Sequence, residues 1–233
     1  MNKIRLIQKI LILVLILAVP GFLYYLLTVK GKNRYHPLPI YGTKTLAKTT
    51  HRVHGKDIPD TIYHTLADFK LYDQEGKPVS LKTFDNKIFV VGFFYSHCPT
   101  VCNEMNSNID SLAKNYTKTK MLSFVSITVD PGRDSIKALS AYATKFSAKL
   151  PQWMFLTGDT TTIYQLARKG FLVNAIQAGK DDFIYSDKLI LVDQNKRIRG
   201  YYSGASAADI LRLHDEIKVL IYEELRKKES ALY

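Results

Sequence analysis

The feature that most constrains this chain is an apolar run, Ile88 to Tyr95, followed at once by its only two cysteines, Cys98 and Cys102. A continuous run of this length, rich in valine and phenylalanine, is typical of a buried strand, and Pro99 suits the opening turn of a helix. The pattern therefore predicts a strand, a cysteine and a helix in that order. At a spacing of four on a helix, both sulfurs lie on one face, with their Cβ atoms roughly 5 to 6 Å apart.

Two sulfurs so placed are near enough to form a disulfide with modest adjustment, or to bind one soft metal ion. Three other interpretations stay open: inert packing as small hydrophobic side chains, a structural zinc site, and a purely structural disulfide. Zinc usually takes four ligands from two separated pairs, and the chain has no second cysteine pair. Closing so short a loop removes little entropy from the unfolded chain, which favours a bridge that opens and closes.

Residues Ile10 to Val29 carry no charge over a length that, as a helix, spans about 30 Å, the thickness of the hydrocarbon layer of a bilayer. We expect an uncleaved transmembrane signal anchor. A cleaved signal peptide is the alternative, since Lys3, Arg5 and Lys9 precede the run, yet no A-x-A-like cleavage site follows it. With residues 1–9 in the cytoplasm, the rest of the chain faces the extracytoplasmic side of the cell (inner) membrane, where a dithiol can be oxidised.

The formal net charge of +12 favours an anionic lipid surface or an acidic partner. The basic residues are scattered rather than gathered in an arm interleaved with stacking aromatic residues, so nucleic acid is not expected as a ligand. Residues 30–62 contain prolines and glycines and show no sustained periodicity, which predicts a juxtamembrane linker. The expected organisation is a cytoplasmic N-terminus at 1–9, a transmembrane anchor at 10–29, a linker at 30–62 and one domain at 63–233.

Strand and helix patterns alternate along that domain. Hairpins are predicted at 68–72 with 78–81 and at 189–193 with 198–202, inner strands at 87–94, 121–129 and 153–157, and helices from the cysteines to about residue 115 and at 135–146, 160–169 and 207–228. Two strand–helix pairs followed by a hairpin and a closing helix predict an α/β fold. We expect a thioredoxin-like mixed sheet flanked by helices and preceded by one N-terminal transmembrane helix.

Four motifs in a fixed order make the domain recognisable. The segment Phe93 to Cys102 ends in a CPxxC pattern, and Asp73 to Leu81 has a turn-forming centre; Val129 to Asp134 reads VDPGRD, and Trp153 to Gly158 reads WMFLTG. Together they resemble the SCO/SenC family, and the likeness covers roughly residues 69–225. The resemblance implies a membrane-anchored thioredoxin-fold protein that takes part in assembling the copper centre of cytochrome c oxidase.

One position departs from that family. Its members carry a copper-ligand histidine in a pattern like HSxxxxLVD, and Tyr185 stands here where that histidine should be. The resemblance implies that Cys98 and Cys102 form the redox pair and bind Cu(I), since thiolates suit Cu(I) while an imidazole helps to accommodate Cu(II). A neutral phenol is a poor substitute. His97 is a weak substitute ligand because neighbouring positions at a strand end point apart, and a methionine such as Met105 is more often core filling.

Asp130 and Arg133 resemble family residues near the site and are expected to support it; a strand-end turn and helix-cap network is the alternative interpretation. We therefore expect a membrane-anchored thiol–disulfide redox protein and weak Cu(I) carrier with no other cofactor. Its expected partner is a cytochrome oxidase subunit or another copper or thiol protein, which makes it an assembly factor rather than a metabolic enzyme. A non-catalytic oxidase-docking module and a general extracytoplasmic thiol reductase are the alternatives.

Overall fold

The computed structural model describes residues 3–26, 37–53, 55–98, 100–177, 179 and 183–230. The chain divides into two units, Met1–His36 and Pro37–Tyr233. The first unit contains helix α1, Lys3–Tyr25, which includes Pro20. Within the described residues, Ile7–Tyr25 is the one helical stretch that is long and apolar enough to cross a membrane, as judged by length and composition. This candidate span overlaps the predicted anchor at 10–29, whose last residues lie outside the described part.

The second unit is built on a five-stranded mixed sheet with the order β11-β10-β5-β6-β7. Strands β5, β6 and β7 are parallel, whereas β10 is antiparallel to both β5 and β11. The strands are β5 Ile88–Phe94, β6 Leu122–Thr128, β7 Trp153–Leu156, β10 Lys188–Val192 and β11 Ile198–Ser203. The sheet confirms the predicted thioredoxin-like arrangement, because the inner strands β5, β6 and β7 form where the sequence patterns predicted them.

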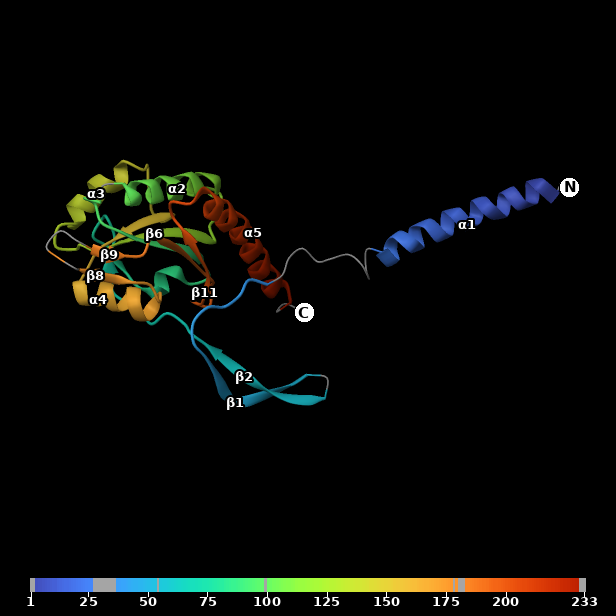
Figure 1. Ribbon diagram of the computed structural model, residues 1–233, viewed down its shortest axis with the longest axis horizontal. Helices are drawn as coiled ribbons and strands as arrows, with labels where there is room; N and C mark the ends of the chain where they lie inside the picture. The colour runs from blue at the N-terminus through green and yellow to red at the C-terminus, as the bar shows by residue number, and fades with distance from the viewer. Residues whose placement is uncertain are drawn as a thin grey trace. The chain divides into compact units, whose positions relative to one another are not determined.

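Helices cover both faces of this sheet, with α2, α3 and α5 along one face and α4 on the other (Figure 1). Their bounds are α2 Val101–Asn115, α3 Ile136–Thr144, α4 Thr160–Gln165 with a π-helical turn η3 at Leu166–Gly170, and α5 Ala207–Ser230. The two-residue period of a strand sends Val90 and Phe94 of β5 into the cluster under α2, α3 and α5. Phe89 and Val91 enter the cluster under α4.

Three small hairpins lie outside the central sheet. The first pairs β3, Leu71–Tyr72, with β4, Pro78–Val79, as predicted, and a short 3₁₀ helix follows at Leu81–Phe84. The second pairs β8, Ala175–Gln177, with β9, Phe183–Tyr185. The third pairs β1, Lys44–Val53, with β2, Lys56–Tyr63. The sequence patterns predicted neither the second nor the third, and the third occupies residues that were expected to form only an irregular linker.

The segment just before β1 is fixed to the domain by a buried arginine. Arg199, 3% exposed, donates from Nε to the carbonyl oxygen of Pro39 at 3.1 Å and from Nη2 to that of Leu38 at 2.6 Å. Its guanidinium also pairs with Glu223 of α5 at 2.8 Å and with Asp193 at 3.3 Å. Glu223 in turn accepts from the amide of Leu38 at 2.7 Å. The chain therefore joins the domain at a defined place, between β11 and α5.

Candidate redox and metal site

The two cysteines lie at the carboxyl end of β5 and form a disulfide. Cys98 sits in the loop after the strand and Cys102 in the first turn of α2, with their Cα atoms 5.8 Å apart. The amide of Cys102 donates to Cys98 Sγ at 3.3 Å, and the amide of Cys98 donates to the carbonyl oxygen of Tyr95 at 3.2 Å. The strand–cysteine–helix order is as predicted, although Pro99, expected to open the helix, lies outside the described residues.

The sulfur pair is nearly enclosed by apolar side chains. Cys98 is 6% exposed and Cys102 is fully buried, in the cluster that also holds Phe94 and Leu189. Met105, one turn further along α2, is fully buried in the same cluster and packs between the backbones of Gly92 and Gly204. Any reagent or partner therefore reaches the pair from the side of Cys98, and the packing of Met105 favours its interpretation as core filling.

A buried carboxylate holds the loop that carries Cys98. Asp134 is fully buried and accepts a hydrogen bond from the amide of Ser96 at 3.0 Å. The same carboxylate accepts short hydrogen bonds from the hydroxyls of Ser96 and Thr128. Thr128 Oγ1 also accepts from the amide of Asp130 at 3.0 Å. The loops that follow β5 and β6 are thereby joined, and the sequence motif that contains Asp134 gave no sign of this role.

Asp130 and Arg133 lie at the same end of the sheet as the cysteines, since the amide of Val129 donates to the carbonyl oxygen of Phe94 at 2.8 Å. Arg133 Nε is 3.5 Å from Asp130 Oδ2, a buried oxygen for which the described residues supply no hydrogen-bond donor. The hydroxyl of Tyr164 donates to the carbonyl oxygen of Val129 at 2.9 Å. Burial and the neighbouring charge of Asp130 raise the pKa of Tyr164. The amides of residues 133 and 134 also donate to the carbonyl oxygen of Asp130, which makes this segment a turn. Asp130 and Arg133 therefore fit both interpretations, as support for the cysteine site and as a strand-end turn.

Within the described part of the chain, no group of three or more His, Cys, Asp or Glu side chains could hold a metal ion. His97 is exposed, and its Nδ1 lies 3.0 Å from Ser96 Oγ. The backbone of Tyr185 pairs with Ala175 in the β8–β9 hairpin, and its side chain lies outside the described part.

The other described histidines make their contacts elsewhere in the domain. His51 bonds Asp60 and His64 bonds the carbonyl oxygen of Gly170, while His214 lies beside Tyr116. His36 and His54 fall outside the described residues.

Beneath the disulfide lies a polar network that the sequence did not predict. Asn106, fully buried one turn after Cys102, donates to the hydroxyl of Tyr142 at 3.2 Å and accepts from Ser126 Oγ at 3.1 Å. Trp153 Nε1 donates to the same Ser126 Oγ at 3.1 Å. Burial raises the pKa of Tyr142, so its hydroxyl keeps its proton and can donate. An asparagine on the apolar face of α2 was the available sign of such a network, because buried amides need partners.

Comparison of the sequence with known proteins identifies the family of this chain. The SCO1/SenC profile matches residues 60–221, which is more than half of the chain. This chain belongs to the SCO1/SenC family. It is 27% identical over 153 residues to an SCO1 protein homologue of Bacillus subtilis, covering 64% of this chain and 79% of that protein. An SCO2-like protein of Rickettsia typhi is 27% identical over 215 residues, covering 88% of this chain and 95% of that protein.

Solved structures of this family share the fold. An SCO1/SenC family lipoprotein from Bacillus anthracis superposes with a TM-score of 0.63 at 29% identity, covering 68% of this chain and 95% of that one. Bradyrhizobium japonicum ScoI, solved with copper bound, superposes with a TM-score of 0.54 at 26% identity, covering 64% of this chain and 98% of that one. The resemblance identified from the four motifs is confirmed.

Proposed function

We propose that this SCO1/SenC protein is a membrane-anchored thiol–disulfide redox protein that also carries Cu(I) weakly during assembly of the cytochrome c oxidase copper centre. The observation that carries the proposal is the Cys98–Cys102 disulfide at the carboxyl end of a central strand, enclosed on every side but that of Cys98. α1 supplies the proposed anchor, and the copper-bound ScoI relative supports copper as the cargo.

The redox step follows from the unequal exposure of the two sulfurs. In the reduced protein, the thiolate of Cys98 attacks one sulfur of a client disulfide; a mixed disulfide forms and the client's other sulfur leaves as a thiolate. The thiolate of Cys102 then attacks Cys98 Sγ, which closes the 98–102 disulfide and releases the client's second thiolate. Two electrons have passed to the client, and a donor dithiol protein restores the reduced state by the reverse exchange.

The copper proposal rests on the donor set. Once reduced, Cys98 and Cys102, whose Cα atoms are 5.8 Å apart, would offer two soft thiolate ligands to one Cu(I) ion. The harder Cu(II) ion needs an imidazole, and Tyr185 occupies the position of the family histidine. We therefore propose thiol–disulfide exchange and Cu(I) transfer as the functions of this chain. A general extracytoplasmic thiol reductase is the second candidate, which the tyrosine at position 185 also favours.

The discriminating experiment uses the full-length reduced protein in detergent. The unaltered chain should compete for Cu(I) against a chromophoric chelator but show no stable copper–thiolate charge-transfer absorption with Cu(II). Tyr185→His should gain that absorption, while the matched control Tyr185→Phe should not. Cys98→Ser should lose Cu(I) binding. Stable Cu(II)–thiolate absorption in the unaltered chain would overturn the redox-shifted assignment, and a failure to bind Cu(I) would leave only the thiol reductase.

The side of the membrane is tested separately. Protease added to intact spheroplasts should remove the domain and leave a short anchored stub. Protection of the whole domain would place the dithiol in a reducing compartment and contradict the redox function.

A further inference from the structure

The part of the chain between α1 and β1, which we call the tether, joins the domain at one end of the central sheet. The cysteines lie at the opposite end of that sheet. Strand β11 is antiparallel to β10, which is antiparallel to β5, so β11 and β5 run in the same direction. Ile198 begins β11 and accepts a hydrogen bond from the amide of Tyr41 at 2.9 Å, while Cys98 follows the far end of β5. Through Val192, Ile198 lies level with Phe89, so five steps along β5 to Phe94 separate the two ends by about 17 Å.

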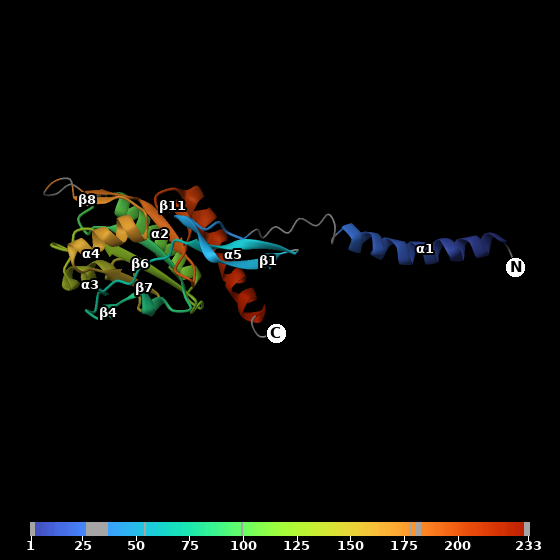
Figure 2. The ribbon, with the colours of Figure 1, turned by 90° about the horizontal axis from the view of Figure 1, so that it is seen from below.

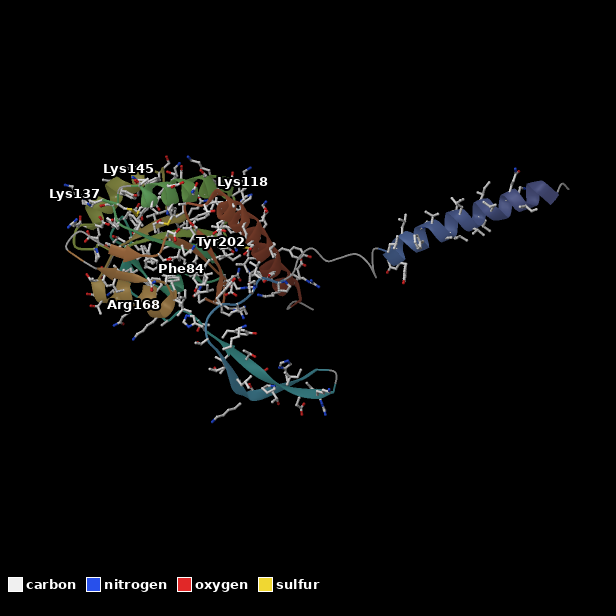
Figure 3. All side chains as sticks on the ribbon, viewed as in Figure 1. Phe84, Lys118, Lys137, Lys145, Arg168 and Tyr202 are labelled. Carbon is white, nitrogen blue, oxygen red and sulfur yellow. A yellow bond between two sulfur atoms is a disulfide. The ribbon has the colours of Figure 1, made fainter. Side chains whose placement is uncertain are left out.

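We call the region around this junction the tether end; it comprises residues 37–41, the β1–β2 hairpin and α5 from Lys218 to Ser230. Helix α5 begins after β11 and returns along the sheet, so its last turns lie beside the junction, where Glu223 binds Leu38. The hairpin and the C-terminal end of α5 leave the domain on the side away from β8 and β9 in both views (Figures 1 and 2). In Figure 3 the labelled Lys118 and Lys137 mark the two opposite ends.

Exposed apolar side chains at the tether end stand among basic ones. On α5, Tyr222 is 53% and Leu225 is 46% exposed, and their spacing of three places them on one face. On β2, Ile58 and Ile62 are exposed and share a face of the strand with Lys56. The basic side chains of the hairpin and of α5 from Lys218 onward are Lys44, Lys48, Arg52, Lys56, Lys218, Arg226, Lys227 and Lys228. The acidic ones are Asp57, Asp60, Glu223, Glu224 and Glu229, so eight positive against five negative charges leave this surface a net charge of +3.

We propose that the tether end rests on the anionic surface of the membrane that holds α1, so that the cysteine pair faces away from the bilayer. Apolar and aromatic groups flanked by lysine and arginine match the boundary between acyl chains and anionic headgroups. The residues numbered 26–36 can span at most about 40 Å even when fully extended, and they add Lys30, Lys32 and Arg34. This proposal rests on the proposed anchoring by α1.

The orientation selects a class of client. With the tether end on the lipid, Cys98 stands about 17 Å or more above the headgroups, because most of β5 lies between them. The thiol or copper site that it serves must therefore be carried on an extramembrane domain that projects from the bilayer, rather than at the membrane surface.

The test measures energy transfer from the domain to the membrane in the full chain. A fluorescent non-cysteine label is placed at Lys118 or at Lys137, both exposed lysines, and the protein is reconstituted into phosphatidylglycerol–phosphatidylcholine vesicles with an acceptor on the headgroup. Because the two ends are separated by about 17 Å along β5, energy transfer from a label at position 118 should be about twofold higher than from one at position 137. Phosphatidylcholine vesicles or high salt should remove the difference in energy transfer between the two positions, since the attraction of the tether end to anionic lipid is electrostatic and screened by salt.

Matched charge reversals locate the surface. The variant Lys48→Glu, Lys56→Glu, Arg226→Glu should abolish the difference, whereas the control Lys70→Glu, Arg168→Glu, Lys169→Glu, which reverses as many charges outside the tether end, should keep it. Equal transfer from both positions in protein that floats with the vesicles, or higher transfer from position 137, overturns the docking proposal alone. A difference that persists without anionic lipid overturns the lipid surface as the occupant. Protein that does not float with the vesicles overturns the anchor and the docking together.

Discussion

Replacing Asp134 by asparagine should loosen the loop that carries Cys98. The carboxylate accepts hydrogen bonds from the amide and hydroxyl of Ser96 and from the hydroxyl of Thr128, in a fully buried setting. Asparagine has nearly the same shape but offers one acceptor oxygen, and its NH₂ group would face at least one of these donors. One or two of the three bonds are therefore lost, while the donors stay buried.

The size of the effect follows from the kind of bond removed. A hydrogen bond to a charged group contributes about 1.5–3 kcal/mol, and a buried donor left unsatisfied costs a similar amount. Since the three bonds share one carboxylate they do not add, and we expect Asp134→Asn to lower the free energy of unfolding by about 3 kcal/mol. Thr128→Val removes the hydroxyl that donates to Asp134 and also accepts from the amide of Asp130, so it should cost a similar amount, about 2–3 kcal/mol.

Two measurements separate a positioning role from a merely structural one. Urea unfolding gives the free energy, and the alkylation rate of Cys98 in the folded, reduced protein reports how well the loop shields its sulfur. Asp134→Asn should raise that rate severalfold. The control is Ser135→Ala, which removes the cap that accepts from the amide of Ala138 at 3.3 Å; it should cost about 1 kcal/mol and leave the alkylation rate unchanged. Unaltered stability, or reduced stability with an unaltered rate, would refute the reasoning.

Two further predictions test the surroundings of the site. A Cβ at Gly204 would overlap Met105 and lie 3.0 Å from the backbone oxygen of Asp187, so Gly204→Ala should destabilise the fold by about 1–3 kcal/mol in urea, whereas Gly132→Ala, whose Cβ meets nothing closer than 3.8 Å, should be tolerated. Burial raises the pKa of Tyr116 to about 12 against about 10 when unfolded, so the unfolded chain loses this proton first. The free energy of unfolding should fall between pH 10 and pH 12, and it should fall less steeply in Tyr116→Phe. Equal slopes in the two proteins would contradict the raised pKa of Tyr116.

The central sheet was predictable because its strands are buried on both faces. Strands β5 and β7 are nearly continuous apolar runs, and β6 alternates apolar residues with serine and threonine; such local patterns are recognised without knowledge of the neighbouring strands. The position of the cysteines at the end of β5 follows from the same local pattern. Predicting the order of the five strands required two further rules. Parallel strands are joined by helices, and a closing hairpin returns beside the first strand.

The features that escaped prediction depend on contacts between distant residues or on strands without a core. β1 is rich in threonine and lysine and buries no apolar face, so no periodic apolar signal marks it. Arg199 binds carbonyl oxygens 160 and 161 residues earlier in the chain, which no local pattern reveals. Asn106 could be placed on the inner face of α2, but its partners on β6 and α3 come from the fold alone.

The unequal burial of the two sulfurs and the position of the tether lead to one conclusion about access. Cys102 is covered completely, so the proposed exchange begins at Cys98, which is itself 6% exposed. In that proposed function, a client presents its own sulfur closely, over the loops that Asp134 joins. With the proposed docking of the tether end on the membrane, that approach to Cys98 stays open. Specificity would then reside in the surface around Cys98, since a sulfur so enclosed excludes every disulfide that cannot fit against these loops.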